Sequence, residues 1–135
     1  LTTQSTSKTT GAVIIAGGVG IGGNVNVGGN LNATEVIQAA SFNATSDYRI
    51  KQNVLMLDAT YNVDVLNPVS YVNLRLGKQD IGFIAHDVQE HYPFLVNGNK
   101  DGEEMQSLNY TGIIGILTRE IKDLKKRVYD LEQKM

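Results

Sequence analysis

A heptad pattern of apolar residues late in the chain limits what this sequence can fold into more than any other feature. Apolar side chains recur there at spacings that alternate between three and four residues: Ile114, Leu117, Ile121, Leu124, Val128, Leu131 and Met135. This 3.5-residue period is typical of a coiled-coil helix, whose apolar seam is buried only against partner helices. We therefore predict that residues 111–135 form a coiled-coil helix. An isolated amphipathic helix is the alternative.

The seam alone does not determine how many helices associate. Ile, Ile, Val and Met occupy one core position of the heptad, and Leu occupies the other. By simple rules this pattern leans to two strands rather than three. A trimer becomes the better prediction only when the rest of the chain is considered.

The first third of the chain has a different composition. Eight of the 14 glycines lie before residue 30, and the segment 22–27 is followed by the matching segment 28–33, which gives a six-residue period. Valine and isoleucine alternate there with Gly or Asn, as in half-buried strands. Repeats this short bury little surface alone and must stack on neighbours. Residues 1–45 are therefore predicted to be the end of a Gly-rich β-stranded fibre shaft, and the chain a fragment of a longer protein.

The same glycines also fit a cofactor motif. Residues 18–23 read Gly-Val-Gly-Ile-Gly-Gly, the GxGxxG spacing of dinucleotide sites. That motif requires a helix after its third glycine, whereas a strand-like alternation follows here. We predict that these glycines form turns and that the chain binds no cofactor.

The middle of the chain, residues 46–110, mixes apolar strand candidates with one short helical stretch. Strands are expected over 69–76 and 81–85, and a helix over 87–91 is expected to stop before Pro93. The fold class predicted for the whole chain is α+β. It comprises the β shaft segment, a small α+β domain and a trimeric coiled-coil helix.

Composition excludes several classes of function. The formal net charge of −2 argues against a nucleic-acid surface, which concentrates Lys and Arg against phosphates. Zero Cys excludes disulfides, thiolate zinc sites and cysteine nucleophiles. No apolar run reaches the length of about 18 residues that a membrane span requires. The two histidines, His86 and His91, are five residues apart, which places them off a common helix face, so no metal site is expected.

The segment from Ser46 to Lys51 holds the parts for nucleophilic chemistry. A serine hydroxyl is a poor nucleophile until a base removes its proton. A lysine can be that base if burial or a neighbouring positive charge, such as Arg49, lowers its pKa. A surface turn leading into a strand accounts for the same residues, so this pattern alone does not establish an enzyme.

Five segments, read in order, resemble the intramolecular chaperone domain of phage tail spikes, peptidase family S74. They are residues 46–53, 66–71, 81–90 and 108–112, followed by the heptad helix. Each is modest alone, but their order and spacing make the resemblance specific, over roughly residues 46–135. Polar His91 is a small departure from the family pattern.

The resemblance implies a homotrimer that assembles an upstream fibre. The domain would bring three chains into register, the β fibre would fold, and autoproteolysis would then release the chaperone. Ser46 would be the nucleophile and Lys51 the general base, with orienting or electrostatic roles for Asp47 and Arg49. The protein would be a virion fibre or tail precursor in the infected host cell, with no nucleic acid, membrane or cofactor as partner.

Ring size favours cleavage between Thr45 and Ser46. Attack by Ser46 Oγ on the Thr45 carbonyl closes a five-membered ring, whereas attack on its own carbonyl would need a strained ring of four. A serine from a neighbouring chain could instead cut after Ser46, and that route stays open. Either route needs an oxyanion stabiliser, for which backbone N–H groups are suited.

Two other functions remain as alternatives. The domain could be a trimerisation cap of a viral fibre that does not cleave, with Ser46 and Lys51 inactive. It could also bind a receptor, which a cluster of exposed aromatic residues would support. The nine aromatic residues are instead spread through the chain.

Overall fold

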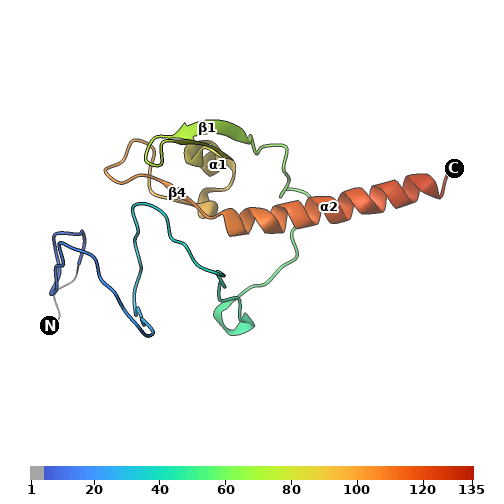
Figure 1. The fold of residues 1–135 in the computed structure, drawn as a ribbon. Helices are drawn as coiled ribbons and strands as arrows, with labels where there is room; N and C mark the ends of the chain where they lie inside the picture. The colour runs from blue at the N-terminus through green and yellow to red at the C-terminus, as the bar shows by residue number, and fades with distance from the viewer. Residues whose placement is uncertain (1–4) are drawn as a thin grey trace. The chain divides into compact units, whose positions relative to one another are not determined.

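The computed structural model describes residues 5–135 and divides the chain into two compact units, one up to Gln38 and one from Ala39 (Figure 1). The first unit belongs to the segment predicted as a fibre shaft. The second contains all of the helices and strands found in the described residues. The boundary that we predict before Ser46, where the chaperone domain would begin, stays a prediction.

The described part of the first unit, residues 5–38, contains no strand. Its backbone bends at 16–17, 22–23, 28–29 and 34–35, which extends the six-residue period of the sequence in both directions. The valines and isoleucines between these bends are more than half exposed. The strands predicted here are therefore not formed within a single chain. A strand needs a neighbour to pair with its N–H and C=O groups, and this segment has no such partner of its own.

The second unit contains two small antiparallel sheets. The hairpin pairs β1 (Val69–Asn73) with β2 (Lys78–Gly82), and the second sheet pairs β3 (Val96–Asn97) with β4 (Ser107–Leu108). The strand predicted over 69–76 is found but is shorter, whereas the strand predicted over 81–85 overlaps β2 only at Ile81 and Gly82. The first ends at Asn73 because its side chain and carbonyl accept hydrogen bonds from the turn, including one of 2.8 Å from the Gly77 N–H.

The helices agree better with the sequence. The short helix α1 (Ala85–His91) stops before Pro93, as predicted, and the 3₁₀ turns η1 (Tyr48–Ile50) and η2 (Pro93–Leu95) complete the unit. The long helix α2 (Tyr110–Glu132) confirms the helix predicted from the heptads. It ends before Met135, which lies beyond the last helical turn. The α+β class is thereby confirmed for this unit.

The core is formed by residues from a loop, α1, Tyr92, η2, β3 and the first turns of α2: Leu66, Val88, Tyr92, Leu95, Val96, Ile113 and Ile116. A Cβ at Gly112 would lie 2.2 Å from Leu95 Cδ2, so a glycine there lets α2 approach η2 closely. His91 is exposed while the next residue, Tyr92, fills the core. The polar departure from the family pattern therefore leaves the packing intact.

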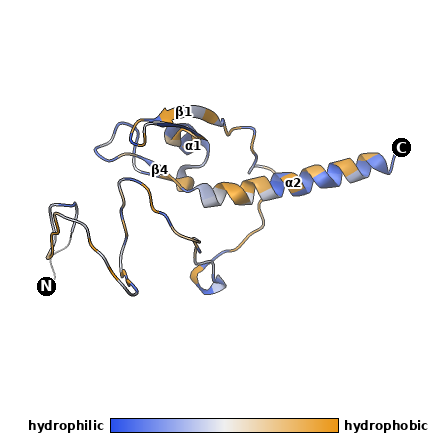
Figure 2. Ribbon diagram, in the orientation of Figure 1, coloured by the Kyte–Doolittle hydropathy of each residue, from blue (hydrophilic) through white to orange (hydrophobic). Residues whose placement is uncertain are grey.

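Helix α2 has a buried face and an exposed apolar face. Ile113 and Ile116 pack in the core, whereas the neighbouring seam residues Ile114 and Leu117 are 61% and 44% exposed. Apolar and polar residues alternate along the rest of the helix (Figure 2). The remaining seam residues of the helix are also exposed: Ile121, Leu124, Val128 and Leu131. The single chain therefore leaves the predicted seam uncovered.

Candidate functional site

The turn η1 brings the two predicted catalytic side chains together. The Ile50 N–H donates to the Asp47 carbonyl and the Lys51 N–H to the Tyr48 carbonyl, at 3.3 and 3.0 Å. These bonds reverse the chain direction within a few residues. Lys51 Nζ consequently lies 2.6 Å from Ser46 Oγ and donates a hydrogen bond to it. The hydroxyl and the amine are thus within the distance that a proton transfer requires.

The two supporting residues, Asp47 and Arg49, hold this turn. The Asp47 carboxylate caps η1 by accepting the Arg49 backbone N–H at 2.9 Å. It also accepts the Arg49 guanidinium at both oxygens, at 2.9 and 2.8 Å, which is a charge-assisted bidentate contact. The side-chain bonds and then the backbone bond from Arg49 lower the pKa of the Asp47 carboxyl. The guanidinium is therefore engaged by Asp47 and does not contact Lys51 or Ser46 in any hydrogen bond described.

The site is open to solvent in the single chain. Ser46 and Lys51 are exposed, and so are the two apolar residues of the turn, Tyr48 and Ile50, at 80% and 67%. Thr45, on the other side of the predicted scissile bond, is exposed in a stretch without regular structure. Burial is what most strongly favours a neutral lysine. Ser46 and Lys51 are therefore correctly placed relative to each other, but the single chain does not exclude water from them.

The segment that follows the turn exposes apolar side chains before it reaches the domain. Val54, Leu55 and Met56 are 74%, 86% and 89% exposed. Leu57 then lies against α2. A Cβ added at Gly115 would be 3.8 Å from Leu57 Cδ1. A groove of about 410 Å³ lies between this segment and α2. Sequence reasoning did not identify this apolar stretch, although four consecutive apolar residues are its signal.

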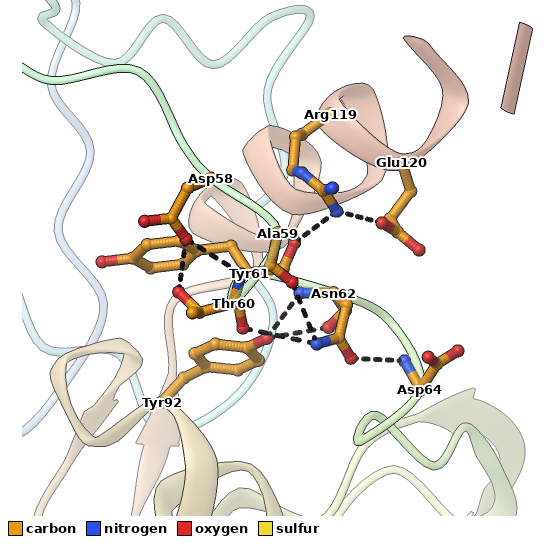
Figure 3. A network of polar contacts seen from close by, with 9 residues as sticks. All are labelled: Asp58, Ala59, Thr60, Tyr61, Asn62, Asp64, Tyr92, Arg119 and Glu120. Carbon is orange, nitrogen blue, oxygen red and sulfur yellow. Dashed lines mark hydrogen bonds and ion pairs between the residues drawn. The ribbon is translucent and has the colours of Figure 1, made fainter. Parts of the chain in front are cut away.

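A polar network then fastens residues 58–64 to the domain (Figure 3). The Tyr92 hydroxyl accepts the Asn62 N–H at 2.9 Å and donates to the Asn62 carbonyl at 2.8 Å. Arg119 of α2 donates to the Tyr61 carbonyl at 3.0 Å and pairs with Glu120. Tyr61 and Tyr92 stack with their rings 6.2 Å apart. The chain leaving the site is therefore anchored to Tyr92, which follows α1, and to α2.

The part of the chain that the structure describes holds neither a metal-ligand cluster nor a membrane-spanning helix. Residues 5–135 contain no group of three or more His, Cys, Asp or Glu side chains that could hold a metal ion. His86 contacts its neighbour Asp87, with Nε2 3.3 Å from Oδ1. Over the same residues, no helix has the length and apolar character needed to cross a membrane.

Comparison with known proteins finds a family match that begins at Ser46. Residues 46–97 match the Peptidase_S74 family, described as chaperone of endosialidase. The matched segment therefore begins at Ser46, includes Lys51 and ends in β3.

Two curated relatives are long tail fibre proteins of phages. The chain is 34% identical over 87 residues to Long tail fiber protein Gp37 of Escherichia phage AR1, which aligns 58% of this chain with 8% of that protein. It is 29% identical over 115 residues to Long tail fiber protein Gp37 of Salmonella phage S16, which aligns 71% of this chain with 15% of that protein. The chain thus spans a small part of the length of either relative. The resemblance to the peptidase S74 family is confirmed over residues 46–97, which hold the first three of the five segments, whereas residues 108–112 and the heptad helix lie outside the matched segment.

Proposed function

We propose that this chain is a fibre-associated intramolecular chaperone that assembles with two further copies of itself and then cuts its own backbone between Thr45 and Ser46. The S74 match and the long tail fibre relatives support the role in a fibre. The exposed heptad seam of α2 supports association through helices. The cut would separate the upstream Gly-rich segment from the domain, so that folding of the fibre could not be reversed by the chaperone.

The cleavage chemistry follows from the Ser46–Lys51 pair. Neutral Lys51 Nζ accepts the hydroxyl proton, and Ser46 Oγ bonds to the Thr45 carbonyl carbon. The Thr45–Ser46 C–N bond then breaks, and the proton held by Lys51 passes to the released nitrogen. The product is an ester between Thr45 and Ser46 Oγ. Water hydrolyses this ester to the Thr45 carboxylate and a chain that begins at Ser46 with a free amine.

Asp47 and Arg49 act as positioning residues in this proposal. Their bidentate contact is 2.8–2.9 Å long and closes the turn that presents Lys51 to Ser46. Neither residue contacts the Ser46 hydroxyl, so neither is assigned a proton. Loss of the contact should slow cleavage by misplacing Lys51, because effective proton transfer requires the donor and acceptor within hydrogen-bond reach.

Assembly would supply the environment that the single chain lacks. The apolar residues around the pair are exposed, notably Tyr48, Ile50 and Leu55. If neighbouring copies cover them, water leaves the site, neutral Lys51 is favoured and an oxyanion is better stabilised by backbone N–H groups. Cleavage would then follow assembly. The heptad seam alone favours a two-stranded coiled coil. We propose three copies because the family resemblance and the six-residue repeats both favour a trimer.

A single observation carries the proposal: Lys51 Nζ lies 2.6 Å from Ser46 Oγ at the first residue of the family match. Intact mass spectrometry of the freshly expressed chain, beside its Ser46→Ala and Lys51→Met variants, tests it. We expect a fragment that begins at Ser46 in the parent and only the full-length mass in both variants. Cleavage that survives Ser46→Ala would overturn the assignment of the nucleophile.

The second candidate is a trimerisation cap that does not cleave. The exposure of Ser46 and Lys51 in the single chain favours it, since neither side chain is buried by the described part of one chain. A full-length mass in the assembled parent protein, unchanged after prolonged incubation, would make this the better description.

A further inference from the structure

The residues on either side of the α2 seam alternate in charge. Association of copies through the apolar seam alone would not require this alternation. In the heptad, Ile121 and Val128 occupy position a, and Leu124 and Leu131 occupy position d. The positions that border the seam are then g and e. Position g holds Glu120 and Arg127, and position e holds Lys125 and Glu132. Side chains at g and e of neighbouring helices pair across a coiled coil and select its partners.

The charges of these four residues are complementary between neighbouring copies. In a parallel coiled coil, a g residue lies beside the e residue five positions later on the next helix. Glu120 would thus face Lys125 of the next copy, and Arg127 would face Glu132. Both contacts join opposite charges when the helices are parallel and in register.

A shift of one heptad in either direction destroys this match. With one direction of slip, Glu120 would face Glu132, which places two carboxylates together. With the other, Arg127 would face Lys125, which places two cations together. The apolar seam tolerates both slips, because a and d positions still meet a and d positions. Only the flanking charges distinguish the correct register from its neighbours.

The structure leaves these charges available for partners. Lys125, Arg127 and Glu132 are exposed and form no hydrogen bond or ion pair within residues 5–135 of the single chain. By contrast, Lys126 and Asp130, on the outer face of the helix, pair with each other at 2.7 Å. Glu120 pairs with Arg119 through Oε1, which leaves its second oxygen for another donor. Three of the four charges beside the seam are thus open to a partner, as are Lys122 and Asp123 at positions b and c.

A groove beside the seam fits the same partner. It has a volume of about 280 Å³ and is lined by apolar and charged residues of α2 together with Val63: Leu117, Glu120, Ile121, Asp123, Leu124 and Arg127. Its lining thus combines apolar seam residues with the g residues Glu120 and Arg127. This is the arrangement that receives an apolar side chain of a neighbouring helix while a charged residue of that helix reaches the wall.

We propose that Glu120–Lys125 and Arg127–Glu132 contacts between copies fix α2 helices parallel and in register, and so set the register of the chains upstream. The inference rests on the proposed function, since it requires that copies associate. It goes further by assigning register to four charged residues instead of to the apolar seam. A chaperone that aligns a repeating shaft needs this information, because six-residue repeats look alike after any whole-repeat slip.

The test compares one substitution at two adjacent positions. Lys125→Glu places a carboxylate opposite Glu120 of the next copy, whereas Lys126→Glu makes the same change on the outer face. We expect Lys125→Glu to raise the concentration for half-assembly by about tenfold, and Lys126→Glu to change it by less than about twofold. Adding Glu120→Lys to Lys125→Glu should restore assembly. Analytical ultracentrifugation over a concentration series, at low salt, measures all four proteins, each carrying Ser46→Ala to prevent cleavage.

Register is read separately with engineered cysteines, because the natural chain has none. Chains carrying Ile121→Cys and chains carrying Val128→Cys are mixed and oxidised. In-register helices give disulfides between identical positions, and slipped helices give the mixed species of distinct mass. Equal effects of Lys125→Glu and Lys126→Glu, or a dominant mixed disulfide, would overturn the charge-coded register. A parent chain that stays monomeric at every concentration would instead overturn the proposed assembly itself.

Discussion

The turn around Ser46 and the domain that follows it are held together by different forces. The turn depends on hydrogen bonds between residues at most five positions apart, and all of its side chains except that of Asp47 are exposed. The domain depends on seven buried apolar residues from loops, strands and both helices. Local hydrogen bonds can set the geometry of a reactive pair, but they cannot remove water from it. The geometry of the site is therefore set by its own sequence, whereas in the proposed assembly other copies would supply its environment.

Helix α2 has both a buried part and an exposed part. Its first turns belong to the domain core through Ile113 and Ile116, and the rest of its apolar surface is exposed. One helix thus stabilises the single chain at one end and offers an association surface along its length. Substitutions in the core should accordingly destabilise the isolated chain, whereas substitutions on the exposed seam should affect the assembled chains.

The largest effect on the isolated chain is expected from Ile116→Ala. Ile116 is 2% exposed, and truncating a buried isoleucine costs about 2–5 kcal/mol of unfolding free energy. Leu55→Ala is the matched control, because Leu55 is 86% exposed and should change stability by less than about 0.5 kcal/mol. Urea unfolding of a dissociated chain measures both. Similar losses in the two variants would contradict the division into packed and uncovered regions.

A smaller effect is expected from Tyr92→Phe. The Tyr92 hydroxyl bonds both the N–H and the carbonyl of Asn62, and its removal leaves these partly buried groups unpaired, at a cost of about 1–3 kcal/mol. Because this contact anchors the segment after the site, hydrogen exchange should also accelerate at Asn62. Unchanged exchange there, with unchanged stability, would show that the network in Figure 3 does not hold the segment.

The smallest effect concerns Asp47 and pH. Arg49 lowers the pKa of Asp47 from its ordinary value of 3.8, so the contact stabilises the turn above that value. The stabilisation fades as pH falls through the lowered pKa, when the carboxylate takes up a proton. We expect the Arg49 Nε–H resonance to stay constant from pH 5 to 8 and to move only in acid below about 3.8. In Asp47→Asn the same resonance should show no such transition, and a transition near neutral pH in the parent would contradict the assignment.

Sequence patterns predicted the parts of this chain whose structure is decided locally. The heptads located α2, and Pro93 marked the end of α1. The pairing of Ser46 with Lys51, which η1 brings together, was expected only from the family resemblance, because their spacing fits a surface turn equally well. The limits of β1 and β2 were wrong because turn hydrogen bonds to Asn73, and not apolar residues, end the first strand.

Contacts between distant residues could not be predicted. Tyr92 meets Asn62 across 30 positions, and Arg119 meets Tyr61 across 58. No periodicity connects positions so far apart, so only the folded chain reveals them. The predicted shaft strands present the opposite case, because their six-residue period is visible as regular bends but residues 5–38 form no strand in the single chain.

Helix α2 and the turn at Ser46 are linked in the proposed function, because assembly through α2 would precede cleavage at Ser46. The direct measurement is the cleavage time course of Leu124→Asp beside the parent, with the oligomeric state followed in the same samples. Leu124 is exposed at the centre of the seam, so the variant should fold normally but remain monomeric. The account predicts that it stays uncleaved while the assembled parent yields a fragment beginning at Ser46. Cleavage of monomeric Leu124→Asp at the parent rate would contradict it.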